Sequence, residues 1–154
     1  MKKLTTFLLS GVLLLGTVAC SEAAKTSADA PNSTEKPAEA PKADNVQTTK
    51  EDGQSETRRK QLNADIKARE ERNNVAGDPT KRASDDLESE VRSKLEANIP
   101  DGALTVEAED DGTVTIAGTV LKQEQLAKIE PLAKKIKGVK TVNVKATVAA
   151  PKAQ

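Results

Sequence analysis

The chain has 154 residues, and its 24 lysines and arginines equal its 24 aspartates and glutamates, so it is formally neutral. It contains no histidine, tryptophan or tyrosine and a single cysteine, which excludes imidazole catalysis, intramolecular disulfides, cysteine redox pairs and His-containing zinc sites. Its one phenylalanine is Phe7, so the rest of the chain offers no aromatic platform for nucleic acid bases or sugars. We therefore predict a non-catalytic protein that has no cofactor or metal and binds no nucleic acid.

Residues 1–19 have the pattern of a secretory signal peptide. Lys2 and Lys3 precede an apolar run from Phe7 to Val18, and this run is too short to span a bilayer permanently. We expect the chain to be exported.

The apolar run leads into Thr17-Val18-Ala19-Cys20, which contains the only cysteine. This stretch resembles the lipobox of bacterial lipoproteins, with Thr17 where that family usually has an aliphatic residue. The resemblance implies that Cys20 is acylated and that the mature protein is a membrane-anchored lipoprotein facing the periplasm or the cell exterior. The alternative is ordinary cleavage within residues 21–23, which would remove Cys20 and release a soluble periplasmic protein.

Residues 20–55 are rich in Ala, Pro, Ser, Thr, Lys and acids, and Val46 is their only large aliphatic residue. A segment of this composition cannot bury enough apolar surface to fold. We predict that it is a disordered linker between the lipid anchor and the rest of the protein.

Residues 56–82 are also polar, but Leu62 and Ile66 lie one helical turn apart. We predict a polar linker with a solvated helix near residues 57–73, stabilised by charge pairs such as Asp65 with Arg69. The alternative is a basic helix that binds an anionic surface, which the thin apolar face supports less well.

A folded unit is predicted to begin with a helix at Ser84, which ends before the turn signal Pro100-Asp101-Gly102. Its apolar face repeats every fourth residue and consists of Leu87, Val91, Leu95 and Ile99. Two strands of alternating apolar and polar residues follow at 104–109 and 113–120, and together they predict a hairpin. We expect the polar face of this hairpin to be solvated or to bind a partner; it carries Thr105, Glu107, Thr113, Thr115 and Thr119.

The acids before Gly112 also suggest a calcium loop, but the EF-hand spacing would place Gly118 where a bidentate Glu is required. We therefore interpret Asp110-Asp111-Gly112 as the hairpin turn, in which Gly112 adopts positive φ. Gly118, inside the second strand, marks a bulge or a close approach of another backbone.

A second helix is predicted from about Lys122 to Lys137, closed by Gly138, with Pro131 causing a kink or a fresh helical start. A third strand follows at residues 142–148, and residues 149–154 are expected to be a disordered tail. Residues 84–148 therefore predict a small two-layer α+β domain of order α-β-β-α-β, with two helices on one face of a three-stranded sheet. The pattern leaves open whether the third strand lies beside the first or the second.

Charge is unevenly distributed along this domain. Residues 84–111 contain ten acids and two bases, whereas residues 112–148 contain seven lysines and two glutamates. Four of these lysines cluster after the second helix and are candidate contacts for anionic head groups, worth about 1 kcal/mol each: Lys134, Lys135, Lys137 and Lys140. The alternative is that they only oppose the helix dipole and keep the domain soluble.

The order of elements, the phrase D-G-T-V-T-I-A-G-T-V and the later G-V-K-T-V-N-V resemble the BON domain family over residues 84–148. Gly112, Gly118 and Gly138 match recurrent glycines of the family, and Pro131 departs from its pattern. The resemblance implies a non-catalytic module of the cell envelope that contacts phospholipid or another envelope surface. The alternative is a protein-interaction or assembly module that uses an exposed sheet edge.

Overall fold

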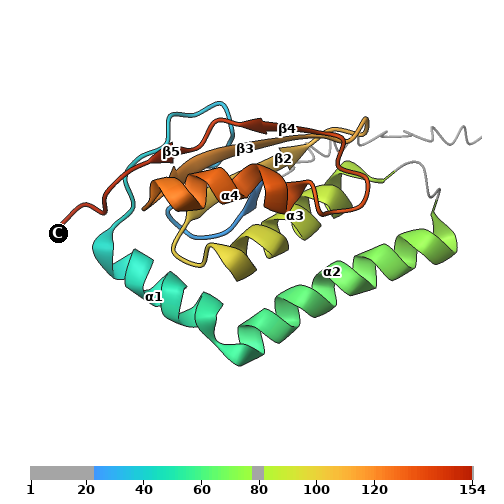
Figure 1. Ribbon diagram of the computed structural model, residues 1–154, viewed down its shortest axis with the longest axis horizontal. Helices are drawn as coiled ribbons and strands as arrows, with labels where there is room; N and C mark the ends of the chain where they lie inside the picture. The colour runs from blue at the N-terminus through green and yellow to red at the C-terminus, as the bar shows by residue number, and fades with distance from the viewer. Residues whose placement is uncertain (1–22, 78–81, 154) are drawn as a thin grey trace, which may run out of the picture.

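The computed structural model describes residues 23–77 and 82–153 (Figure 1). The predicted signal peptide, residues 1–19, and the predicted lipid site Cys20 lie outside the described residues. The described residues form nine elements, in chain order β1 (Ala24–Lys25), α1 (Ala43–Gln54), α2 (Glu56–Ala76), α3 (Ser84–Asn98), β2 (Ala103–Ala108), β3 (Thr113–Val120), α4 (Gln123–Ala133), β4 (Thr141–Val144) and β5 (Thr147–Val148). The predicted α+β class is confirmed.

The sheet is mixed, with strand order β1-β2-β3-β4 and with β5 also paired to β3. β2 and β3 form the predicted antiparallel hairpin. β4 and β5 run parallel to β3, because the chain returns through the crossover helix α4. The predicted third strand thus lies beside the second and is interrupted after Val144. In the part of the chain that the structure describes, the sheet has five strands rather than three, because of this interruption and because β1 joins the edge of β2.

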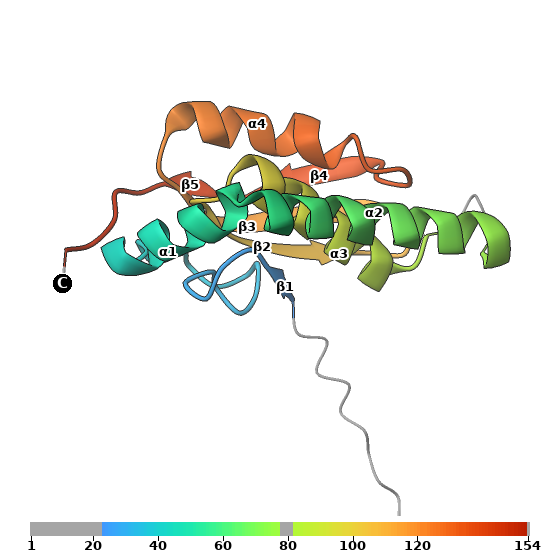
Figure 2. The same ribbon diagram turned by 90° about the horizontal axis from the view of Figure 1, so that it is seen from below.

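The core lies between the sheet and the two helices α3 and α4, which cover one face as predicted (Figures 1 and 2). The four apolar residues predicted for α3 are at most 1% exposed. They pack against side chains from the sheet and from α4, including Leu104, Val106, Val114, Ile116, Ile129 and Leu132. Aliphatic residues fill this core because the described chain contains no aromatic residue.

Glycine is required at two points of the hairpin. In the turn, Gly112 donates its N–H to the Glu109 carbonyl at 2.9 Å and has φ 90°, as the last residue of a three-residue hairpin loop commonly does. Gly118 has φ 123°, and a Cβ there would lie 2.0 Å from the Ala103 carbonyl oxygen. Because the ladder continues through Gly118, this glycine marks a close approach and not a bulge.

Helix α4 ends at Ala133, four residues before the predicted end at Lys137. Pro131 lies inside the helix, so the helix does not restart there. Its missing N–H removes only the bond to the carbonyl four residues earlier, and Lys134 still donates its N–H to the Glu130 carbonyl at 3.0 Å. Beyond it, Ile136 donates to the Ala133 carbonyl at 3.0 Å, which is the tighter three-residue spacing. Gly138 therefore lies in the connection to β4 and does not close the helix.

The structure differs from the predicted disordered linker in residues 23–55, which pair with the sheet and then form α1. β1 pairs with β2 in the register Ala24↔Val106. The following segment crosses the sheet face opposite α3 and α4, where Thr34 donates its N–H to Glu107 Oε1 at 3.1 Å. It buries Thr105 and Thr119 of the predicted solvated face to 0% and 1% exposure. Composition did not reveal this, because the segment docks on an existing sheet and needs no core of its own.

Two further predictions need correction. The predicted tail is hydrogen-bonded in its described part, since Lys152 donates its N–H to the Pro41 carbonyl at 2.9 Å. The polar helix exists as α2 with the predicted Asp65–Arg69 pair at 3.1 Å, but it packs on α3 instead of being surrounded by solvent.

None of the described helices is long and apolar enough to cross a membrane.

Candidate functional site

The four candidate lysines occupy a turn-rich segment, residues 134–140, which we call the lysine turn. Lys134 follows the last residue of α4, and Lys140 directly precedes β4. Ile136 is 3% exposed and anchors the segment in the core, so the lysines on either side of it are held at the surface. All four lysine side chains are exposed, and they lie at one end of the sheet.

The hairpin turn, residues 109–112, lies at the same end and supplies opposite charge. The Lys140 N–H donates to the Gly112 carbonyl at 2.9 Å, which joins the two segments. Hydrogen bonds from Thr113 lower the pKa of Asp111, and the charge of Lys140 lowers it further. Glu109 and Asp110 are exposed beside Asp111. The lysine turn is therefore bordered by three carboxylates, which reduce its attraction for an anion.

Two of the lysines have polar partners in the structure. Lys134 Nζ lies 2.6 Å from Glu130 Oε1, one helical turn earlier. Lys137 Nζ donates to Asn74 Oδ1 at the end of α2, at 3.0 Å. These contacts hold the side chains near the surface, while both remain accessible to solvent.

A buried ion pair lies beneath the lysine turn. Arg82 Nη1 donates to the Lys137 carbonyl at 3.1 Å, and Arg82 Nη2 pairs with Glu90 Oε1 of α3. The two residues are 4% and 0% exposed. Burial raises the pKa of Glu90 to about 7, although the charge of Arg82 opposes this shift. Arg82 thus links α3 to the backbone of the lysine turn.

Three neighbours of the lysines were not predicted from the sequence, namely Arg82, Glu90 and Asn74. Glu90 follows Leu87 by three residues, so a strict helical count places it at the border of the apolar face. Arg82 lies outside every periodic pattern, and nothing in the sequence indicates its position.

The N-terminal end of β1 points toward this same end of the sheet. β1 is antiparallel to β2, and Ala24 pairs with Val106, so the first residue of β1 lies on the side of the hairpin turn and the second residue lies farther from it. The lysine turn, the hairpin turn and the entry of the chain therefore share one end of the domain.

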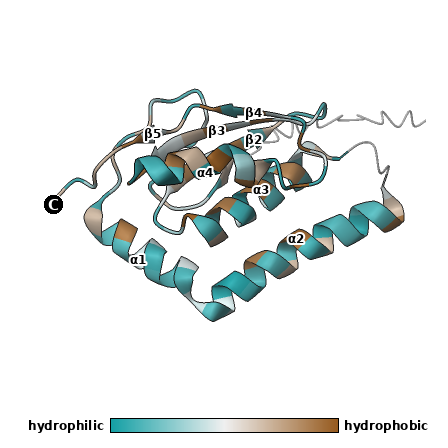
Figure 3. Cartoon of the chain, in the orientation of Figure 1, coloured by the Kyte–Doolittle hydropathy of each residue, from teal (hydrophilic) through white to brown (hydrophobic). Residues whose placement is uncertain are grey.

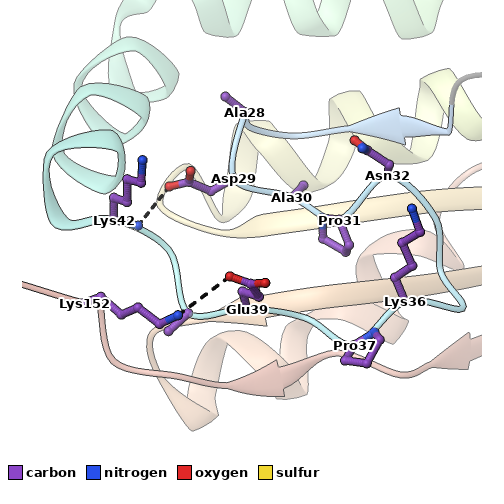
Figure 4. A pocket seen from close by; sticks show the side chains of 11 residues that line it. Ala28, Asp29, Ala30, Pro31, Asn32, Lys36, Pro37, Glu39, Lys42 and Lys152 are labelled. Carbon is purple, nitrogen blue, oxygen red and sulfur yellow. Dashed lines mark hydrogen bonds and ion pairs between the residues drawn. The ribbon is translucent and has the colours of Figure 1, made fainter.

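A hollow of about 410 Å³ lies at the other side of the molecule, between residues 28–42 and Lys152 (Figure 4). Asp29 accepts a hydrogen bond from the Lys42 N–H at 3.0 Å, and Lys152 Nζ lies 3.7 Å from Glu39. The mixture of exposed lysines and carboxylates selects neither an anion nor a cation. In the described part of the chain, no group of three or more Asp, Glu or Cys residues is close enough to hold a metal ion.

The chain thus contains a small module of the α+β class with an exposed charged end. The family model described as BON domain matches residues 83–150, so this part of the chain is a BON domain. BON domains are non-catalytic binding modules of envelope and periplasmic proteins and have been proposed to bind phospholipid. Comparisons with curated proteins and with solved structures returned no match.

Proposed function

We propose that this protein is an exported lipoprotein, acylated at Cys20, whose BON domain contacts an anionic phospholipid surface through the lysine turn. The observation that carries this proposal is that the chain enters β1 at the end of the sheet that bears Lys134, Lys135, Lys137 and Lys140. A lipid attached just before β1 would bring that end to the membrane.

The short chain between Cys20 and β1 also supports this contact. Ala24 already belongs to the sheet, and it follows Cys20 by four residues in the sequence. Four residues span at most about 14 Å. The long tether expected from composition is thereby shortened to a few residues, and a domain held this close gains a high effective concentration at the surface. Weak lysine contacts of about 1 kcal/mol each are then sufficient to hold the lysine turn against the phospholipid surface.

Co-sedimentation with vesicles of mixed phosphatidylcholine and phosphatidylglycerol tests the contact. The chain without its first 20 residues keeps every described element and separates the lysine turn from the lipid anchor. We expect Lys134→Glu, Lys135→Glu and Lys137→Glu together to weaken binding about a hundredfold at low salt. A matched control reverses Lys42, Lys50 and Lys152, which are exposed, and should bind as the wild type does. These lysines lie in or next to α1 and near the C-terminus, on the opposite side of the molecule from the connection between α4 and β4 (Figure 1).

The acids of the hairpin turn give a test of opposite sign. Replacing Asp110 and Asp111 by Asn should strengthen vesicle binding, since it removes charges that oppose the lysines. Equal binding by wild type and lysine variants, or no binding at any salt concentration, would refute the lipid contact. The intact mass of the mature protein tests the anchor separately, because acylation of Cys20 adds the mass of its acyl chains.

A second candidate function, protein interaction through a sheet edge, is supported by β4 and β5. Within the described residues these strands pair only with β3, and Val144 and Val148 on them are 37% and 42% exposed. An added strand from another protein could pair along this edge. Along β4, Thr141 and Lys145 donate their N–H groups to β3, so the N–H of Val144 faces the free edge. An envelope protein retained by the wild type and lost by a Val144→Pro variant, in which the edge lacks one N–H, would favour this function.

A further inference from the structure

Helix α2 packs on α3 with little apolar contact. Leu62 is buried at 2% exposure, Ile66 is partly buried, and Val75 is 88% exposed. Most residues of the helix are hydrophilic, with a few hydrophobic residues between them (Figure 3). Helices that pack inside proteins normally bury an apolar stripe, so another interaction must hold α2 in place.

Arginine–carboxylate pairs supply that interaction along the length of the two helices. Arg58 Nε lies 2.6 Å from Glu96 Oε1, near the start of α2 and the end of α3. Toward the other end, Arg69 Nη1 and Arg72 Nη2 lie 2.6 Å and 2.8 Å from Asp86 Oδ1. The acids belong to α3, so the acidic half of the domain faces the basic helix that precedes it.

The cations of α2 are divided between two faces. Arg58, Arg69 and Arg72 point to α3, whereas Arg59, Lys60 and Lys67 are exposed. Lys60 and Lys67 pair within the helix, with Glu56 at 2.7 Å and Glu71 at 3.6 Å. In the described chain, the helix therefore carries three cations that form ion pairs with α3 and three other cations that do not.

Release of α2 would leave few groups without a partner. Asp86 lies near the surface, at 19% side-chain exposure, and would be hydrated. Glu96 would keep Arg92, whose Nη1 lies 2.8 Å from Glu96 Oε2. The BON domain, residues 83–150, contains α3, α4 and strands β2 to β5 but neither α1 nor α2. Of the apolar residues in these two helices, Ile66 alone packs against the main core, and it is only partly buried.

We propose that the outer face of α3 is a docking surface for a cationic helix and that α2 of this chain occupies it reversibly. Helices α1 and α2 form a strap that opens at high ionic strength, while the BON domain stays folded. The acidic face of α3 then becomes accessible, and Arg58, Arg69 and Arg72 of α2 are released to solvent.

Hydrogen–deuterium exchange of the chain without its first 20 residues, followed by mass spectrometry, tests the strap directly. The Debye length falls from about 30 Å at 0.01 M salt to about 3 Å at 1 M, so the arginine pairs weaken across this range. We expect amides of residues 56–76 to exchange at least about tenfold faster at the higher salt concentration. Exchange in β2 and β3 should not change, and it also reports whether each variant is folded.

Two triple variants isolate the arginine pairs. Replacing Arg58, Arg69 and Arg72 by Ala should give fast exchange in α2 already at low salt. Replacing Arg59, Lys60 and Lys67 by Ala removes the same charge from the same helix and should leave α2 as protected as in the wild type. Equal protection of wild-type α2 at both salt concentrations, simultaneous loss of protection in α2 and β3, or equal opening in the two triple variants would each overturn the proposal.

Discussion

Replacement of Glu90 by Gln should change how the stability of this protein depends on pH. Glu90 is 0% exposed, and burial raises its pKa from 4.5 to about 7 against the opposing charge of Arg82. The folded state therefore holds this proton more tightly than the unfolded state. The stabilisation of the folded state by this bound proton is complete below about pH 4.5, and it is lost as the pH rises through about 7. The difference in the pKa of Glu90 between the two states corresponds to about 3 kcal/mol of unfolding free energy, at 1.36 kcal/mol per pKa unit.

Urea unfolding of both proteins at about pH 4 and about pH 8 measures this difference. Far-UV circular dichroism is the suitable signal, because the chain has no tryptophan or tyrosine. Relative to the Glu90→Gln variant, the wild type should lose about 3 kcal/mol of unfolding free energy between these pH values. The exposed Glu124→Gln variant is the control and should follow the wild type. A wild-type advantage that stays constant, or that grows with pH, would show that the pair with Arg82 keeps Glu90 charged and would refute the reasoning.

Three further substitutions test the fold. Gly112→Val should lower the melting temperature, because φ is 90° and a Cβ would lie 2.5 Å from the Gly138 carbonyl oxygen; an unchanged melting temperature would contradict the assigned turn. Gly118→Ala should destabilise the domain by about 3 kcal/mol or more, since its Cβ would meet the Ala103 carbonyl, and a loss below about 1 kcal/mol in urea unfolding would argue against that contact. Leu62→Ala should speed amide exchange in α2 and leave β2 and β3 unchanged, because this side chain is buried outside the main core; equal loss of protection in β3 would contradict that separation.

The spacing of apolar residues predicted the helices and strands of the domain, because each element shows its own spacing within one continuous stretch of residues. The four-residue spacing from Leu87 to Ile99 gave the buried face of α3, and alternation gave the hairpin β2–β3. The same method predicted too long a helix α4, since aliphatic spacing continues to Ile136 while the backbone after Ala133 changes to hydrogen bonds of three-residue spacing. The lysines after this helix were found by their clustering, but the neighbouring acids Asp110 and Asp111 lie more than twenty residues earlier in the chain.

The sequence alone determined the α+β class, the order of the domain's elements and the position of its hairpin, because these depend on local apolar spacing and on turn residues. Only the tertiary structure decided that the N-terminal segment joins β2, that α2 rests on α3 and that Arg82 lies beneath the lysine turn. Each of these contacts joins polar residues far apart in the chain through hydrogen bonds and ion pairs. Such contacts have no period in the sequence, and they form only after the core has brought their partners together.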